Sequence, residues 1–152
     1  EIYDLETGEK ICRLQGSQRR AHSVIWSPNS QLVLVPCGPT ALLFDARSGE
    51  RLGTCQGASS DVRMGTFSPD SSMVLVVSQD GFASLFSAPS GASLRQMSEV
   101  GKWNGSVHFF SSCDSILTVL RDGTARIFDA ASGRSLRTFR ENGWLSDAAL
   151  AV

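Results

Sequence analysis

Four short segments of this chain repeat one another at a nearly constant interval. Each segment begins with an aromatic residue and carries a glycine five residues later. The aromatic residues are Tyr3, Phe44, Phe86 and Phe128, and the glycines are Gly8, Gly49, Gly91 and Gly133. Both series step by 41, 42 and 42 residues. A unit of this length must stack on its neighbours to bury its apolar surface, so the period constrains the fold more than any other feature.

The unit at residues 57–98 predicts four short strands. Its second apolar run, Met73 to Val77, has no polar side and is therefore expected to be covered on both faces. The turn residues Ser68-Pro69-Asp70-Ser71 precede this run, and the hairpin signal Asp80-Gly81 follows it. Short strands repeated every 41 or 42 residues, without helical periodicity, are typical of propeller blades. The sequence thus predicts an all-β fold of four-stranded antiparallel blades.

The period extends this layout along the chain. It predicts strands near residues 23–27, 32–36, 41–45, 51–55, 62–68, 73–78, 82–87, 93–97, 107–110, 116–120, 125–129 and 135–139. The complete units are residues 15–56, 57–98 and 99–140, with partial units at residues 1–14 and 141–152. Propellers close with about four to eight blades, whereas 152 residues supply about 3.6 units. We therefore expect the chain to be a segment of a larger propeller.

Three further motifs recur in register with the period. Aromatic–Asp pairs end third strands at Tyr3-Asp4, Phe44-Asp45 and Phe128-Asp129. Ser-Pro turns follow first strands at Trp26-Ser27-Pro28-Asn29 and Phe67-Ser68-Pro69-Asp70, and Asp-Gly hairpin signals occur at Asp80-Gly81 and Asp122-Gly123. Together these motifs resemble the WD40-repeat family over essentially the whole chain. The resemblance implies a partial WD40-type β-propeller that holds protein partners on a rigid platform.

The chain departs from the WD40 pattern at the polar positions of each blade. Tyr or Phe stands in place of the family's Trp, and the family's Gly-His pair is replaced by Gly16-Ser17, Gly57-Ala58 and Glu99-Val100. The buried network that such a His shares with the hairpin Asp therefore cannot form. We expect Asp80 and Asp122 to bond mainly to their own turn amides, and the blades to depend more on apolar packing.

Neither catalysis nor a metal site is indicated. The chain has no G-x-S-x-G elbow, no H-E-x-x-H motif and no phosphate-binding loop. Its prominent Asp and Ser residues recur in turns, whereas an active site needs one asymmetric constellation. Cys12, Cys37, Cys55 and Cys113 are widely spaced, with Cys55 on an apolar column and Cys12 beside an expected inward-facing Ile11. We expect no catalytic residue, metal or cofactor, and reduced intracellular cysteines.

The charge and hydropathy pattern exclude several partners. The formal net charge of −1 gives no reason to expect DNA, RNA or an anionic membrane. No apolar run approaches the roughly 18 residues of a membrane-spanning helix. We expect no nucleic-acid or membrane partner, and an intracellular location, with the cytoplasm first and the nucleus as the alternative.

The loops between fourth and first strands escape the repeat and contain the candidate partner-binding residues. These residues are Arg19, Arg20, Asp61, Arg63, Lys102, Trp103 and Trp144. In a propeller such loops surround the same mouth of the channel, and Arg and aromatic residues are typical of binding hot spots. The alternative for Trp103 is that its ring folds over its own blade.

These observations predict a non-catalytic interaction scaffold. Its expected partners are other proteins and the remaining blades of the same propeller. Two alternatives stay open. The chain could be a regulatory or targeting segment of a larger enzyme, or it could supply structural blades with no partner surface of their own.

Overall fold

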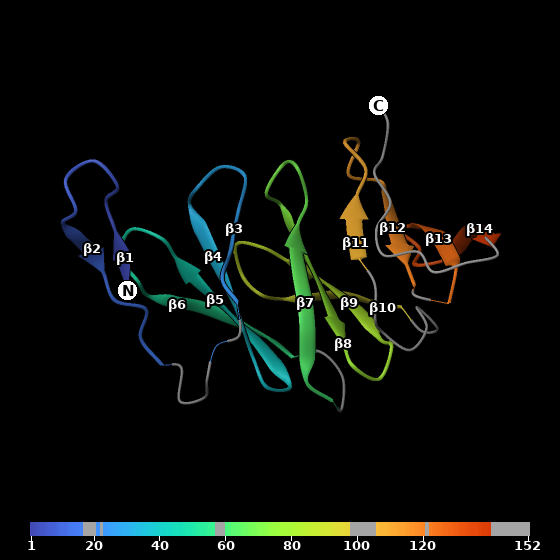
Figure 1. Ribbon diagram of the computed structural model, residues 1–152, viewed down its shortest axis with the longest axis horizontal. Helices are drawn as coiled ribbons and strands as arrows, with labels where there is room; N and C mark the ends of the chain where they lie inside the picture. The colour runs from blue at the N-terminus through green and yellow to red at the C-terminus, as the bar shows by residue number, and fades with distance from the viewer. Residues whose placement is uncertain (17–20, 22, 57–59, 98–105, 121, 141–152) are drawn as a thin grey trace.

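The computed structural model describes residues 1–16, 21, 23–56, 60–97, 106–120 and 122–140. Within these residues the chain forms strands and turns, and no helix is long and apolar enough to cross a membrane. The strands form three four-stranded antiparallel sheets, called blades below, and one two-stranded sheet (Figure 1). This arrangement confirms the predicted all-β fold built from repeated four-stranded units.

Each blade is a meander in which consecutive strands pair. The first blade contains β3 (Ile25–Trp26), β4 (Leu32–Cys37), β5 (Thr40–Asp45) and β6 (Arg51–Gln56). The second contains β7 (Val62–Phe67), β8 (Met73–Ser78), β9 (Ala83–Ser87) and β10 (Ser93–Met97). The third contains β11 (Ser106–Phe109), β12 (Ser115–Val119), β13 (Thr124–Asp129) and β14 (Ser135–Arg140). Strands β1 (Ile2–Tyr3) and β2 (Lys10–Cys12) pair with each other and are called the N-terminal hairpin.

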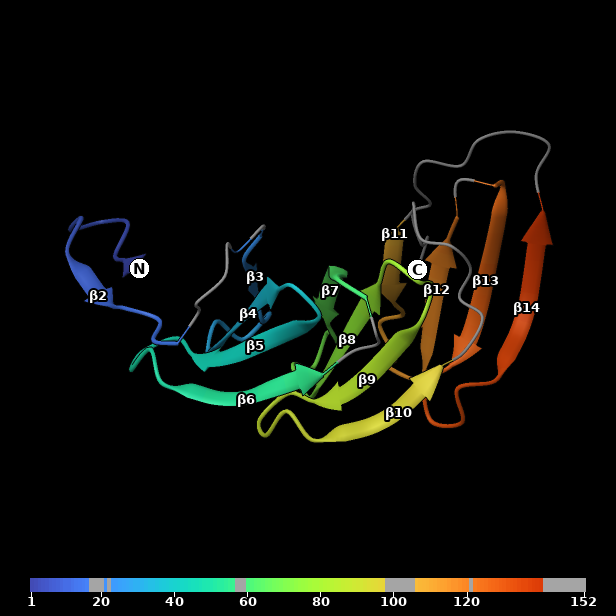
Figure 2. The ribbon, with the colours of Figure 1, turned by 90° about the horizontal axis from the view of Figure 1, so that it is seen from below.

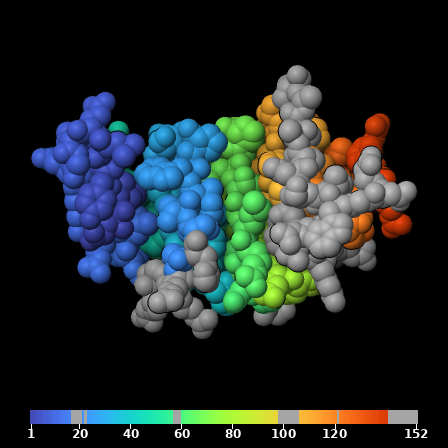
Figure 3. Space-filling view, in the orientation of Figure 1, coloured from blue at the N-terminus to red at the C-terminus, as the bar shows by residue number. Residues whose placement is uncertain are grey.

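The blades stand side by side in an open arc. The N-terminal hairpin and β14 lie at opposite ends of this arc, and the first strands β3, β7 and β11 lie along its inner side (Figure 2). The fourth strands β6, β10 and β14 follow its outer side. The space-filling view shows the hairpin and the blades as columns in chain order (Figure 3). All twelve strands predicted from the period are present, although β3 is shorter than predicted.

In the first and second blades, the second strand is buried on both faces because its residues alternate between two neighbouring sheets. In β8, Val74 and Val76 belong to the apolar cluster shared with the first blade. Their neighbours Leu75 and Val77 belong to the cluster shared with the third blade. In β4, Val33 likewise packs towards the N-terminal hairpin. This alternation confirms that an apolar run with no polar side lies between two sheets.

Every fourth strand leaves one apolar residue outside the pairing register. These residues are Ile11, Leu52, Leu94 and Leu136, each skipped where the register shifts. A bulge of this kind turns the extra side chain away from its expected face. All four side chains are exposed. The prediction that Ile11 faces inward is therefore wrong, and Cys12 is buried in its place.

Glycines in the turns between third and fourth strands permit close contact with the preceding blade. Gly49, Gly91 and Gly133 have φ values of 74°, 67° and 69°, which favour glycine. A Cβ at Gly49 would lie 2.5 Å from the carbonyl oxygen of Arg13 on the preceding half-blade. A Cβ at Gly91 would lie 3.2 Å from Gly53 on the first blade. The repeated glycines thus serve the turn and the blade–blade contact together.

Truncation of an interblade residue should destabilise the protein far more than truncation of a bulge residue. Leu75→Ala removes a fully buried side chain between the second and third blades and should cost about 2–5 kcal/mol in the free energy of unfolding. Leu94→Ala, on the exposed bulge of the same blade, is the matched control and should change it by about 0.5 kcal/mol or less. Urea unfolding followed by circular dichroism measures both values. Equal losses would contradict the interblade core.

Candidate functional site

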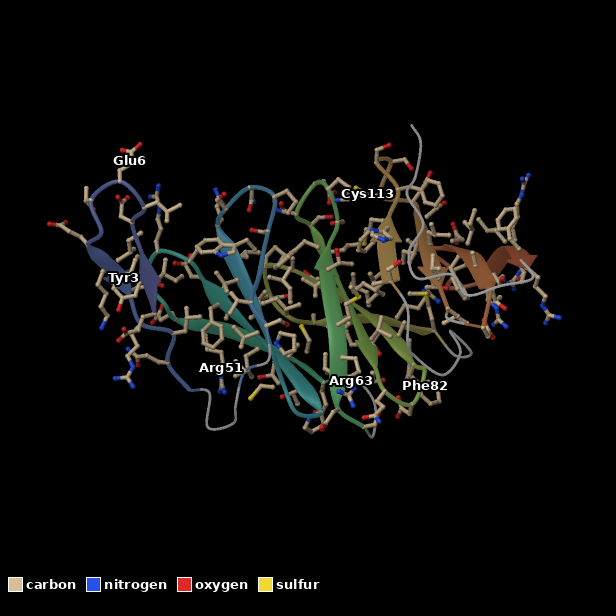
Figure 4. The ribbon with its side chains drawn as sticks, viewed as in Figure 1. Tyr3, Glu6, Arg51, Arg63, Phe82 and Cys113 are labelled. Carbon is tan, nitrogen blue, oxygen red and sulfur yellow. The ribbon has the colours of Figure 1, made fainter. Side chains whose placement is uncertain are left out.

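The loop before β7 and the turn between β8 and β9 form one exposed rim, called the lower rim below. It contains Ser60, Asp61, Arg63, Gln79 and Phe82. Arg63 and Phe82 lie at the same edge of the arc, near the lower margin in Figure 4. All of these residues except Ser60, which is half-buried, are exposed. A cation, a carboxylate and an aromatic ring are therefore exposed together on this rim.

Hydrogen bonds hold the two parts of the lower rim together. The guanidinium of Arg63 donates from Nη2 to Oε1 of Gln79 at 2.8 Å. The amide of Gln79 donates to the carbonyl oxygen of Asp61 at 2.9 Å. The amide of Asp80 donates to Oγ of Ser60 at 2.9 Å. These bonds join Ser60, Asp61 and Arg63 to the turn between β8 and β9.

The lower rim is also joined to the neighbouring blade. The amide of Val62, the first residue of β7, donates to the carbonyl oxygen of Gly38 at 2.7 Å. Gly38 lies in the turn between β4 and β5, on the same edge of the first blade. A backbone hydrogen bond therefore joins the first and second blades at this edge.

Phe82 is a rim residue that sequence reasoning missed. The equivalent residues of the other blades are Thr40 and Thr124, so the aromatic ring replaces a small polar side chain at one repeat only. It follows the Asp80-Gly81 turn and is exposed at the rim. The sequence could have indicated this residue, because an aromatic side chain stands at a position that is polar in the other repeats.

Two of the seven predicted partner-binding residues lie in the described part of the chain. Asp61 and Arg63 are exposed and lie together on the lower rim. The other five lie outside the described residues: Arg19, Arg20, Lys102, Trp103 and Trp144. The structure therefore brings together the two residues from one loop and adds Gln79 and Phe82 to them.

The hairpin aspartates make local bonds, as expected for Asp122. Its Oδ1 accepts a hydrogen bond from the amide of Thr124 in the same turn, at 2.9 Å. Oδ1 of Asp80 accepts from the hydroxyl of Ser78 at 2.6 Å, so a side chain also supports this turn. The sequence predicted that both aspartates would bond within their own turns. The bond from the Ser78 hydroxyl to Asp80 was not predicted.

The opposite edge of the arc contains the Ser-Pro turns and a contact between them. The amide of Asn29 in the first blade donates to Oγ of Ser71 in the second, at 3.1 Å. Within the second turn, Oδ1 of Asp70 accepts from the hydroxyl of Ser68 at 2.5 Å and from the amide of Ser72 at 3.0 Å. These bonds, that to Ser68 foremost, lower the pKa of Asp70 to about 2. The polar groups of these turns therefore stabilise the turns and the contact between them.

The turns between third and fourth strands contain carboxylates with lowered pKa values. The pKa of Asp45 is lowered chiefly by the backbone amide of Ser48, at 2.7 Å from Oδ1, and then by the Ser48 hydroxyl. The pKa of Asp129 is lowered first by the hydroxyl and then by the backbone amide of Ser132, with a smaller contribution from the charge of Arg95. The lowered pKa values keep both of these half-buried aspartates ionised at neutral pH.

None of the four cysteines, all of which lie among the described residues, forms a disulfide bond. Cys12, Cys37 and Cys55 are buried, and Cys113 is half-buried in a turn. Burial raises the pKa of Cys55 to about 11, which keeps the thiol protonated and inert. Among the described residues, no group of three or more His, Cys, Asp or Glu side chains could hold a metal ion.

A shallow cavity of about 320 Å³ opens between the second and third blades. Its lining is mostly apolar, with one arginine and one aspartate: Met73, Leu85, Leu94, Arg95, Cys113, Asp114, Ala130 and Ala131. The guanidinium of Arg95 is within 3.4 Å of the carbonyl oxygen of Ser132, across the blade boundary. The arginine therefore helps to join the blades.

Comparison with known proteins supports the fold alone. No family model and no curated protein matches the chain. The computationally designed Ika8 protein is similar with a TM-score of 0.83 and 19% identity, over 99% of this chain and 46% of that chain. The computationally designed Ika4 protein is similar with a TM-score of 0.79 and 18% identity, over 95% of this chain and 88% of that chain. The chain thus spans about half the length of Ika8.

The Ser-Pro turn at residues 68–71 should make the free energy of unfolding depend on pH in the acid range. Because the pKa of Asp70 is about 2 in the folded chain and near 3.8 ordinarily, its contribution is complete above about pH 4 and is lost as pH falls towards 2. Melting temperatures between pH 2 and 5 should fall less steeply in Asp70→Asn than in the original chain. Asp61→Asn, which leaves the turn intact, is the control and should keep the original slope. If the melting temperature of Asp70→Asn fell with pH as steeply as that of the original chain, the lowered pKa of Asp70 would be refuted.

Proposed function

We propose that this chain is a WD40-type segment of a β-propeller and acts as a non-catalytic platform for protein partners. The repeated four-stranded blades and the motifs in register with them support the architecture. The lower rim supports the function. The remaining blades of the propeller and separate proteins are its proposed partners.

The observation that carries the proposal is the pre-ordering of exposed binding groups on the lower rim. Arg63 is bonded to Gln79, and the loop of Ser60 is bonded to the turn of Asp80. A binding surface that is already ordered loses little conformational entropy when a partner docks. Arg63 adds a residue type that is enriched in protein-binding hot spots, and Phe82 adds an aromatic side chain of a type that is enriched at protein interfaces. By their place in the repeat, Arg19, Arg20, Lys102, Trp103 and Trp144 belong to the same proposed surface.

The cellular location is part of the same proposal. Four cysteines without a disulfide bond, three of them buried, suit a reducing compartment such as the cytoplasm or nucleus. The net charge of −1 favours protein partners over nucleic acids.

Changing the lower rim should weaken partner binding without loss of stability. A Phe82→Ala and Arg63→Glu double variant removes the exposed ring and reverses the charge. Loss of a hot-spot anchor typically costs about 2 kcal/mol, so binding should weaken about 30-fold. The measurement is quantitative mass spectrometry of proteins captured by the tagged chain, followed by affinity measurement with the enriched partner.

The matched control carries the same types of change away from the lower rim. Leu52→Ala lies on the outer strand β6, and Arg47→Glu lies in the turn after β5. Melting temperatures of both double variants should stay near that of the original chain. Partner binding that survives the rim variant, or falls equally in the control, would overturn the proposal.

A further inference from the structure

We propose that the cavity between the second and third blades binds a small organic cation, namely an aromatic ring that carries an alkylammonium group. The ring would lie on the apolar floor of the cavity, and the ammonium group would pair with the exposed carboxylate of Asp114. Cys113, which also lines the cavity, lies near the upper margin in Figure 4, on the edge of the arc opposite the lower rim. The inference therefore goes beyond the proposed platform and can fail without it.

The cavity lies at a blade boundary that carries an arginine where the first boundary carries a glycine. Gly53 and Arg95 occupy equivalent positions on the fourth strands, 42 residues apart. At the first boundary, a Cβ at Gly53 would lie 2.7 Å from the carbonyl oxygen of Ser90, so the two backbones are in contact there. At the second boundary, the side chain of Arg95 runs past Gly133 to the carbonyl oxygen of Ser132. The cavity opens beside this side chain.

The floor of the cavity is apolar and suits a ring. Leu85 and Ala130 are 2% and 4% exposed and belong to the apolar core between the two blades. Met73 is half-buried against that core, and a thioether makes favourable contacts with the edge of an aromatic ring. The volume of about 320 Å³ is near the lower end of the range for small-molecule pockets. One substituted ring is therefore the size of ligand that fits.

Of the two charged residues that line the cavity, Arg95 already has partners. Its guanidinium donates to the carbonyl oxygen of Ser132. Its positive charge also contributes to the lowered pKa of Asp129, after the hydroxyl and the amide of Ser132. A carboxylate of the protein therefore already lies close to this cation.

Asp114 is ionised and has no cationic partner among the described residues. Its Oδ1 accepts a hydrogen bond from the Ser112 hydroxyl at 2.5 Å, which is the chief reason that its pKa is lowered. The salt bridge found in the described part of the chain joins Lys10 to Glu1, far from the cavity.

The summed charge beside the cavity favours a cation. The negative charge of Asp129 acts on Asp114 and, as a minor effect, raises its pKa, so the two carboxylates are electrostatic neighbours. Together with Arg95 they carry a formal charge of −1. Complementary charge directs a ligand to a site and excludes ligands of the wrong sign. A ligand with an ammonium group is therefore favoured over one with a carboxylate.

Three probes of similar size and different charge test the class of ligand. Phenethylammonium, phenylpropionate and phenethyl alcohol are each titrated into the isotope-labelled chain and followed by NMR chemical shifts. Phenethylammonium should bind with a dissociation constant of about 1 mM. The other two should bind about 5-fold more weakly or worse, because they cannot form the ion pair. The shifts should fall on the amides of cavity residues such as Leu94, Cys113 and Ala131.

Substitutions in the lining test the contacts. Asp114→Asn removes the charge and keeps an acceptor oxygen for the Ser112 hydroxyl, so phenethylammonium should bind about 5-fold more weakly while phenethyl alcohol is unaffected. Asp61→Asn, on the lower rim, is the matched control and should leave binding unchanged. Ala131→Phe, at an exposed lining position, should fill the cavity and abolish the shifts. Unchanged melting temperatures would show that the variants are folded.

Three results would contradict this assignment. Tighter binding of phenylpropionate than of phenethylammonium would make Arg95 the charged contact. Equal affinities of the original chain and Asp114→Asn for phenethylammonium would exclude the ion pair. Unshifted lining residues at about ten times the expected dissociation constant would show that the cavity does not bind this class of ligand.

Discussion

Face-to-face apolar contact between neighbouring blades is the interaction on which the rest of this structure depends. The second strands β4 and β8 supply side chains alternately to the sheet before them and the sheet after them, as Val74 and Leu75 of β8 do. No blade can therefore bury its core alone. The same requirement explains why Phe44 is fully buried while Tyr3, at the first repeat, is largely exposed.

Glycine and serine positions adapt the turns to this stacking. Gly91 lets the second blade approach Gly53 of the first, and Ser71 accepts a hydrogen bond from the first blade's Asn29. Both contacts lie at blade boundaries, so turn chemistry and packing reinforce each other. The loops on the opposite edge include the lower rim. There the Arg63–Gln79 hydrogen bond joins the loop before β7 to the turn between β8 and β9.

The lower rim and the ends of the arc are different parts of the same architecture. The lower rim depends on loops that vary between repeats, whereas the ends of the arc present surfaces that the interior blades bury. Rim residues can thus change without disturbing the stacking, because their side chains are exposed. End residues such as Phe139 cannot be separated from stacking, because the equivalent Met97 is 2% exposed between blades.

The sequence by itself determined the period, the all-β class and nearly all strand positions, because turn residues and apolar runs act locally. It also located the bond of Asp122 within its own turn. Only the tertiary structure decided that Ile11 faces outward, since Ile11 forms a bulge in β2 opposite Ile2 and Tyr3 and this bulge shifts the alternation of side chains. It alone joined Arg63 to Gln79 and exposed Phe82, because these placements depend on how separate strands meet at the rim.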